Sequence, residues 1–194
     1  EPMIFALAAV SMTVGNLIAL RQTNIVRMLA YSGVAQAGYM LAPLAVASDV
    51  PDSALAATVS YLVIYAAMNL GAFAVVIAVA RKTRSAEIED YRGLFHYAPG
   101  LTVAMTIFLF ALAGIPPLGG WWAKFRIMGA VIEANTVSGV VLGVFVAVNS
   151  VIALYYYARI GAKMWADEAP DGDLNPIRIP ASLTSALVIT VAAT

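Results

Sequence analysis

The sequence has no cysteine and one histidine, His96. Without cysteine the chain forms no disulfide, performs no thiol catalysis and holds no cysteine-ligated cluster. A metal site built from several imidazoles is excluded in the same way. We therefore expect this chain to have no cofactor, no metal ion and no redox chemistry of its own.

Charge is also scarce. Charged residues make up 11% of the chain, against about 25% in soluble domains. Hydrophobic residues make up 62%, against roughly 45–50%. The net charge is zero and no basic block stands out, which argues against a nucleic-acid partner. The composition predicts an all-α, polytopic membrane protein surrounded by the lipid bilayer.

Six apolar runs, separated by polar turns, predict six membrane segments. These are residues 2–20, 25–47, 54–80, a broken segment at 101–132, 137–164, and a run from 181 that is cut short. The sequence starts with Glu1 rather than an initiator methionine, so we expect it to be part of a longer polytopic chain. We divide it into a helix bundle over residues 1–164 and a loop with a truncated last span over 165–194.

The charges test this count of segments. Nine basic residues fall on one side of the predicted membrane: Arg21, Arg27, Arg81, Lys82, Arg84, Arg92, Arg159, Lys163 and Arg178. The other side receives Glu1, Asp49, Asp52 and Glu133 and no basic residue. By the positive-inside rule we expect the basic loops to be cytoplasmic. The alanine- and valine-rich composition is typical of bacteria with GC-rich DNA, which places the expected location in the bacterial inner membrane.

A helix break interrupts the fourth segment. Pro116 and Pro117 remove two backbone donors and clash with the preceding turn, while Gly114, Gly119 and Gly120 weaken the helix around them. Non-helical backbone at membrane depth is tolerated only where protein buries it or where it lines a polar cavity. The break is therefore a candidate site, of a kind typical of transporters built from inverted repeats.

Lys124 follows the break. We expect the helix to resume at about Trp121 and to run to Ile132, which puts Lys124 about nine residues, or roughly 14 Å, from the surface. This depth is near the middle of a hydrocarbon core about 30 Å thick. Burial disfavours the charged ammonium, so Lys124 is a candidate proton relay. The alternatives are a lysine that extends to the surface or a fixed partner of a carboxylate.

Two polar stripes at helical spacing lie in neighbouring segments. One contains Ser32, Gln36 and Tyr39, and the other contains Tyr61, Tyr65 and Asn69. Hydroxyl and amide groups both donate and accept hydrogen bonds. The stripes therefore either hold a water path beside Lys124 or join helices to one another.

Several sequence runs resemble a known family. They are GNLIALRQTNIVRMLAYS at residues 15–32, YRGLF at 91–95, LAGIPP at 112–117 with Gly120 and Lys124-Phe125, and LYYYAR at 154–159. Together they resemble the antiporter-like subunit N family of proton-pumping NADH:quinone oxidoreductase, respiratory complex I. A lysine at 124 and the tyrosine-rich run favour subunit N over its sister subunits L and M.

This resemblance implies a fourteen-helix, antiporter-like inverted-repeat fold, of which the chain covers the C-terminal half. Each repeat has a discontinuous transmembrane helix and a central lysine, and Lys124 matches the lysine of the second repeat, which belongs to the proton path. The implied function is proton translocation driven by quinone reduction in a distant part of the complex. NADH, FMN, iron–sulfur clusters and quinone would bind other subunits, and the partners would be other membrane-arm subunits.

The sequence departs from the family at two positions. Many relatives have lysine where Val26 stands and histidine where Gln36 stands. Valine cannot carry a proton, and glutamine orients water without titrating. More of the transfer then depends on Lys124, or on water. Two alternative functions stay open: a subunit of a multisubunit cation/proton antiporter, and a structural membrane subunit in which Lys124 is a fixed ion pair.

Overall fold

The computed structural model describes residues 1–169, 175–177 and 179–194, so Arg178 and five further residues of the predicted loop, 170–174, lie outside the described residues. The described part is helical and contains no strand. Its elements are α1 (Pro2–Leu20), α2 (Ile25–Leu44), α3 (Pro51–Thr83), the 3₁₀ helix η1 (Ile88–Tyr91), α4 (Leu94–Tyr97), α5 (Pro99–Ala113), α6 (Gly119–Glu133), α7 (Val137–Ala166) and α8 (Ala181–Ala192). The predicted all-α class is confirmed.

Local chemistry sets the helix starts. The side chain of Asn24 accepts a hydrogen bond from the backbone N–H of Arg27 (3.1 Å) and so caps α2. Thr136 caps α7 in the same way, since its hydroxyl accepts from the N–H of Gly139 (3.1 Å). Pro51 begins α3, where its missing N–H leaves no bond unmade. Two of these helices thus begin after a capping side chain, and the third begins at a proline, which has no N–H to satisfy.

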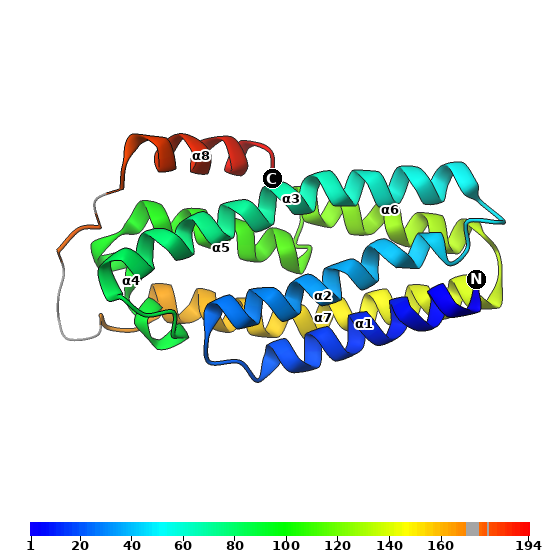
Figure 1. The fold of residues 1–194 in the computed structure, drawn as a ribbon, viewed down its shortest axis with the longest axis horizontal. Helices are drawn as coiled ribbons and strands as arrows, with labels where there is room; N and C mark the ends of the chain where they lie inside the picture. Colours follow the sequence, from blue (N-terminus) through cyan, green and yellow to red (C-terminus); the bar gives the residue numbers. More distant parts are fainter. Residues whose placement is uncertain (170–174, 178) are drawn as a thin grey trace.

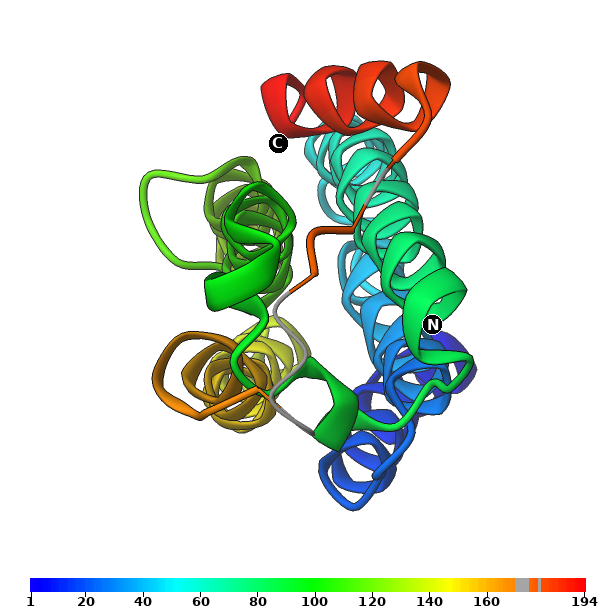
Figure 2. The ribbon, with the colours of Figure 1, turned by 90° about the vertical axis from the view of Figure 1, so that its left-hand side faces the viewer.

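The long helices run side by side (Figure 1). Three of them, α1, α3 and α7, are long and apolar enough to cross a membrane. The shorter α5 and α6 follow one another along the same axis, and both pack against α3 and α7. Together they make one interrupted crossing. Figure 2, from the end, shows α8 on the outside of the bundle beside α3.

The break between α5 and α6 is shorter than we expected. Gly119 and Gly120 form the first turn of α6, rather than belonging to the break. The reason is close packing: a Cβ atom at Gly120 would overlap the carbonyl group of Ala111. Only residues 114–118 are non-helical. Gly114 ends α5 at φ 89°, in the left-handed region that glycine adopts at little cost.

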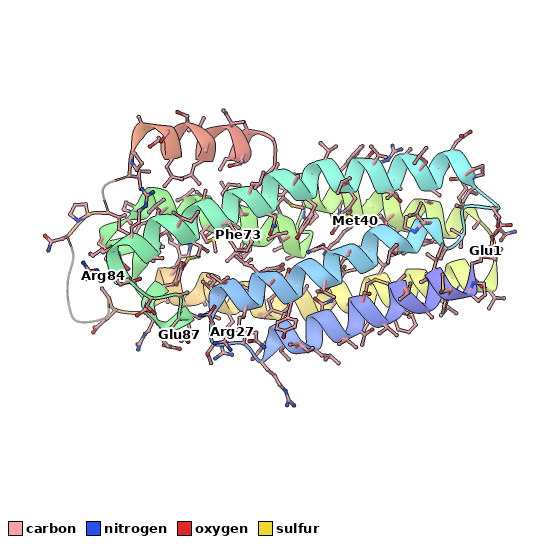
Figure 3. All side chains as sticks on the ribbon, viewed as in Figure 1. Glu1, Arg27, Met40, Phe73, Arg84 and Glu87 are labelled. Carbon is pink, nitrogen blue, oxygen red and sulfur yellow. The ribbon has the colours of Figure 1, made fainter. Side chains whose placement is uncertain are left out.

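Charged side chains separate the two ends of the bundle. Figure 3 shows Arg27 and Arg84 at one end and Glu1 at the other. We call the first the basic end; there the loops after α1 and α3 meet, and Lys163 of α7 pairs with Glu89 at 2.7 Å. We call the second the acidic end. There the hydroxyl of Ser48 donates a hydrogen bond to the carboxylate of Glu1. The arrangement agrees with the sides assigned from the sequence.

The close approach at Gly120 generates a stability prediction. Gly120→Ala places a methyl group against backbone that cannot rotate away, and we expect it to destabilise the protein by about 1–3 kcal/mol. Gly129→Ala is the matched control on the same helix, because a Cβ atom there meets nothing within 4 Å. Thermal unfolding of the purified protein measures both. Equal stability of Gly120→Ala and wild type would contradict the packing of α6 on α5.

Candidate functional site

The C-terminus of α5 begins the site, because the last four carbonyl groups of a helix lack partners within that helix. The first two are satisfied by the chain that follows. The carbonyl of Phe110 accepts from the N–H groups of Gly114 and Ile115, both at 3.0 Å, and that of Ala111 accepts from Gly114 at 2.9 Å. The left-handed turn at Gly114 makes these bonds possible.

The other two carbonyl groups, those of Leu112 and Ala113, are left free by the prolines. In a continuous helix they would accept from residues 116 and 117, but Pro116 and Pro117 have no N–H. Lys124 replaces both donors. Its Nζ atom lies 3.0 Å from the carbonyl oxygen of Leu112 and 2.9 Å from that of Ala113. The break thus creates two acceptors, and the lysine of the next helix occupies both.

Lys124 is deeply buried, with 7% of its surface exposed. Its Nζ atom lies 4.6 Å from the centre of the Tyr39 ring, a cation–π contact. A Cβ atom at Gly114 would come within 2.8 Å of the lysine side chain, so the glycine gives Lys124 room to cross the break. Among the described residues no carboxylate pairs with it. The partial negative charge at the end of α5 is therefore its main electrostatic partner.

Gln36 joins the same acceptor from α2. Its amide nitrogen donates to the carbonyl oxygen of Leu112 at 3.2 Å. Its amide oxygen accepts a hydrogen bond from the hydroxyl of Tyr61, on α3. The structure therefore brings together Lys124, Gln36 and Tyr61, three of the residues singled out in the sequence.

Tyr65 and Asn69, the other two residues of the polar stripe on α3, do not join this network. Both are half-buried, and neither makes a hydrogen bond within the described residues. The hydroxyl of Tyr65 lies against Gly33, 2.9 Å from the position of a Cβ atom there. A spacing of four residues advances about 40° beyond one helical turn. Asn69 is therefore rotated by about 80° from Tyr61, away from Gln36.

A second buried network links α1 and α7, and sequence reasoning missed it. The amide nitrogen of Asn16 lies 3.2 Å from both the side-chain and the backbone oxygen of Asn149, and 3.4 Å from the Tyr39 hydroxyl. The hydroxyl of Tyr156 donates to the side-chain oxygen of Asn16 at 3.0 Å. The available signal was a lone asparagine in each of two apolar spans, because a buried amide requires partners.

Tyr157 and Ser32 lie between the two networks. Their hydroxyl groups share a hydrogen bond, and the ring of Tyr157 lies 4.4 Å from that of Tyr156. Tyr157 also lies beside Gln36. Polar groups therefore continue from Asn16 to the surroundings of Lys124 without leaving the interior.

Other charged and titratable residues face outward. Arg126 is exposed on α6 and stacks on Trp122, with 5.1 Å from the guanidinium carbon to the ring centre. His96 is exposed at the basic end, and Glu133 is exposed where α6 ends. Within the described residues no group of three or more His, Cys, Asp and Glu side chains is placed to hold a metal ion.

Comparison with known proteins gives consistent matches. The family model described as NADH:quinone oxidoreductase/Mrp antiporter, TM, matches residues 1–150. NADH-quinone oxidoreductase subunit N of Heliobacterium modesticaldum is 42% identical over 190 residues, which are 97% of this chain and 39% of that protein. The chain thus spans about two fifths of the length of this relative.

Two solved structures match nearly the whole fold. A chain of respiratory complex I from Thermus thermophilus with bound aureothin has a TM-score of 0.81 and 30% identity, over 99% of this chain and 42% of that one. A chain of the Mrp complex from Dietzia sp. has a TM-score of 0.85 at 19% identity, over 99% of this chain and 43% of that one. The second likeness concerns the fold alone.

The network around Asn16 generates a second stability prediction. Asn16→Leu leaves the Tyr156 hydroxyl and the Asn149 side chain short of a buried partner, so we expect a loss of about 1–3 kcal/mol. Asn69→Leu, the control, removes no hydrogen bond of the described residues, and its effect should stay within about 0.5 kcal/mol. Thermal unfolding of the purified protein compares the two. Equal losses would show that Asn16 is not the junction of this network.

Proposed function

The chain belongs to the NADH:quinone oxidoreductase/Mrp antiporter transmembrane family, and from this membership we propose that it is part of a proton-translocating membrane subunit of NADH:quinone oxidoreductase. Residues 1–164 form the transmembrane bundle of its second repeat, and residues 165–194 form a loop and a last membrane helix. Lys124 is the proton relay. The observation that carries the proposal is the double hydrogen bond of Lys124 to the carbonyl groups freed by Pro116 and Pro117.

The geometry suits a group that alternates between two protonation states. A lysine ammonium has three N–H donors, and two of them point at Leu112 and Ala113. The third is free to pass a proton. The neutral amine keeps two donors, so both carbonyl oxygens remain satisfied after the proton leaves. Neither state therefore leaves a buried acceptor unpaired, which would otherwise cost about 1–3 kcal/mol.

Gln36 and Tyr61 hold the water path beside the lysine. The Gln36 amide nitrogen and the Lys124 Nζ atom both donate to the carbonyl oxygen of Leu112. Gln36 does not titrate; its role is to orient water and the hydroxyl of Tyr61. Tyr65 and Asn69, which do not join this network, are not assigned to the path. Lys124 is then the one titrating group of this path.

Coupling comes from outside the chain. Reduction of quinone by NADH, with FMN, iron–sulfur clusters and quinone bound by other subunits, would shift Lys124 between its loaded and unloaded states through neighbouring membrane-arm subunits. We place the protein in the bacterial inner membrane, with the basic end in the cytoplasm. Relatives named as subunits of NADH-quinone oxidoreductase favour a place in that enzyme complex over a place in a separate cation/proton antiporter.

The proposal is tested by Lys124→Met in the intact complex, in sealed vesicles, with NADH-driven quinone reduction and the proton gradient recorded together. Removing a relay group typically lowers the rate of the proton-transfer step by roughly 100-fold or more. We therefore expect fewer protons translocated per electron in the complex that assembles. The amount of assembled complex is measured beside this ratio, because the variant leaves the carbonyl group of Ala113 without its partner.

Arg126→Met is the matched control. It removes a positive charge two residues away on the same helix, from a side chain that faces outward. Its ratio of protons to electrons should equal that of wild type. A wild-type ratio in Lys124→Met would refute the relay and leave Lys124 a structural residue. Copurification with a sodium-driven antiporter, without flavin and iron–sulfur subunits, would favour the antiporter.

A further inference from the structure

Helix α6 has two faces with different surroundings. Its inner face packs against α2, α3 and α7, and it buries Ala123, Lys124 and Ile127. Its outer face is exposed along the same length. The side chains of that face are Trp121, Trp122, Phe125, Arg126, Gly129 and Ile132. The face is aromatic and apolar except at Arg126, and a charged side chain in such a place is rare in membrane helices.

Arg126 belongs to the deep part of the membrane segment. Helix α6 ends at Glu133, at the acidic end. Arg126 precedes this residue by seven positions, so it lies about 10 Å from that surface at about 1.5 Å per residue. Half of the hydrocarbon core is about 15 Å thick. The backbone of Arg126 is therefore about 5 Å from the middle of the bilayer.

The side chain of Arg126 points further inward. Side chains of an α-helix lean towards its N-terminus, and the N-terminus of α6 is at the break. The guanidinium carbon lies 5.1 Å from the centre of the Trp122 ring, which is one turn nearer to the break. The charge is thus held away from the nearest membrane surface. Arg126 is not a side chain that extends towards the lipid headgroups.

This positive charge needs a negative partner. Within the described part of the chain Arg126 forms no ion pair and no hydrogen bond, and its cation–π contact is with Trp122. Arginine keeps its charge in proteins. Charged side chains at the centre of a membrane almost always face protein or water and pair with another polar group. Lipid chains offer no such group, so the partner lies on a further protein segment.

The side chains around Arg126 are typical of a protein interface. Trp121 stacks on Phe125, with ring centres 5.7 Å apart. Tryptophan and arginine are enriched among the residues that contribute most to binding between proteins. Gly129, about one turn nearer to the acidic end, is open, because a Cβ atom there would meet nothing within 4 Å. Small residues of this kind let a second membrane helix approach closely.

We propose that the outer face of α6 is an interface with a membrane helix of another subunit, and that this helix carries an Asp or Glu side chain paired with Arg126 near the middle of the bilayer. The planar guanidinium group binds a carboxylate through two parallel hydrogen bonds. The inference rests on the proposed place of the chain in a multisubunit membrane complex, and not on the relay at Lys124. The Thermus thermophilus chain compared above is part of such a complex.

The first test identifies the neighbour. Phe125, which is 64% exposed, is replaced in the intact complex by the photoreactive amino acid p-benzoylphenylalanine, and the cross-linked segment is identified by mass spectrometry. We expect a membrane helix of another subunit, with an Asp or Glu close to the cross-linked position. A cross-link only to phospholipid, or only to another segment of the same polypeptide, would overturn the proposal.

The second test reverses the charge. Arg126→Glu puts a negative charge opposite the carboxylate of the partner. Loss of one member of a desolvated charge pair weakens association by roughly 30-fold or more, so we expect much less assembled complex on a native gel. Arg126→Lys keeps the positive charge and should retain assembly. Glu133→Lys is the matched control, because it reverses a charge at the exposed end of the same helix, and its amount of complex should equal that of wild type.

An exchange of charges separates a lost pair from a folding defect. The Asp or Glu found by cross-linking is changed to Arg in the complex that carries Arg126→Glu. Assembly that is restored in the double variant, and low in each single variant, supports the pair. Wild-type assembly of Arg126→Glu, or no recovery in the double variant, overturns it.

The outcomes also separate this interface from the proposed function. The ratio of protons to electrons is measured in the complex that assembles, so weaker association at Arg126 leaves that ratio unchanged, as expected for Arg126→Met above. A wild-type ratio in Lys124→Met overturns the relay and leaves the interface in place. A cross-link to a subunit of a cation/proton antiporter overturns the assignment to NADH:quinone oxidoreductase and supports the interface.

Discussion

The structure depends on one exchange of hydrogen-bond donors. Pro116 and Pro117 withhold two N–H groups from α5, and the ammonium of Lys124 supplies two in their place. An unpaired carbonyl group costs several kcal/mol in a bilayer, so a break without such a substitute would be unstable at membrane depth. The cost of burying an ammonium is offset by the same contact, because it meets the negative end of a helix dipole. Break and lysine therefore stabilise each other.

Polar side chains elsewhere in the interior follow the same constraint. Asn16 and Asn149 satisfy each other across α1 and α7, and Tyr61 satisfies Gln36 across α3 and α2. Such bonds hold helices that have no hydrophobic drive to associate in lipid. They also place polar groups of four helices beside one another in the interior.

Two glycines allow close approaches that a side chain would block. At Gly114 the missing side chain lets Lys124 cross the break, and at Gly120 it lets α6 approach the carbonyl of Ala111. Both keep the interrupted crossing compact enough for the lysine to reach two acceptors from the following helix. A longer, looser break would place Nζ beyond hydrogen-bond range. The short connection, residues 114–118, is therefore part of the site and not only a link between two helices.

The sequence alone determined the helical segments, the charges that gather at each end of the bundle, the position of the break and the burial of Lys124, because apolar runs, basic turns and prolines act locally. It also pointed to Gln36 and Tyr61. It misjudged the length of the break, since helix packing, not propensity, makes Gly119 and Gly120 helical. Only the tertiary structure decided which atoms Lys124 binds and that Asn69 is turned away from Gln36. It also decided that Asn16 contacts Asn149, 133 residues later in the chain, and Tyr156, 140 residues later. Helical spacing fixes which residues share a face of one helix. The faces that meet depend on how all the helices pack.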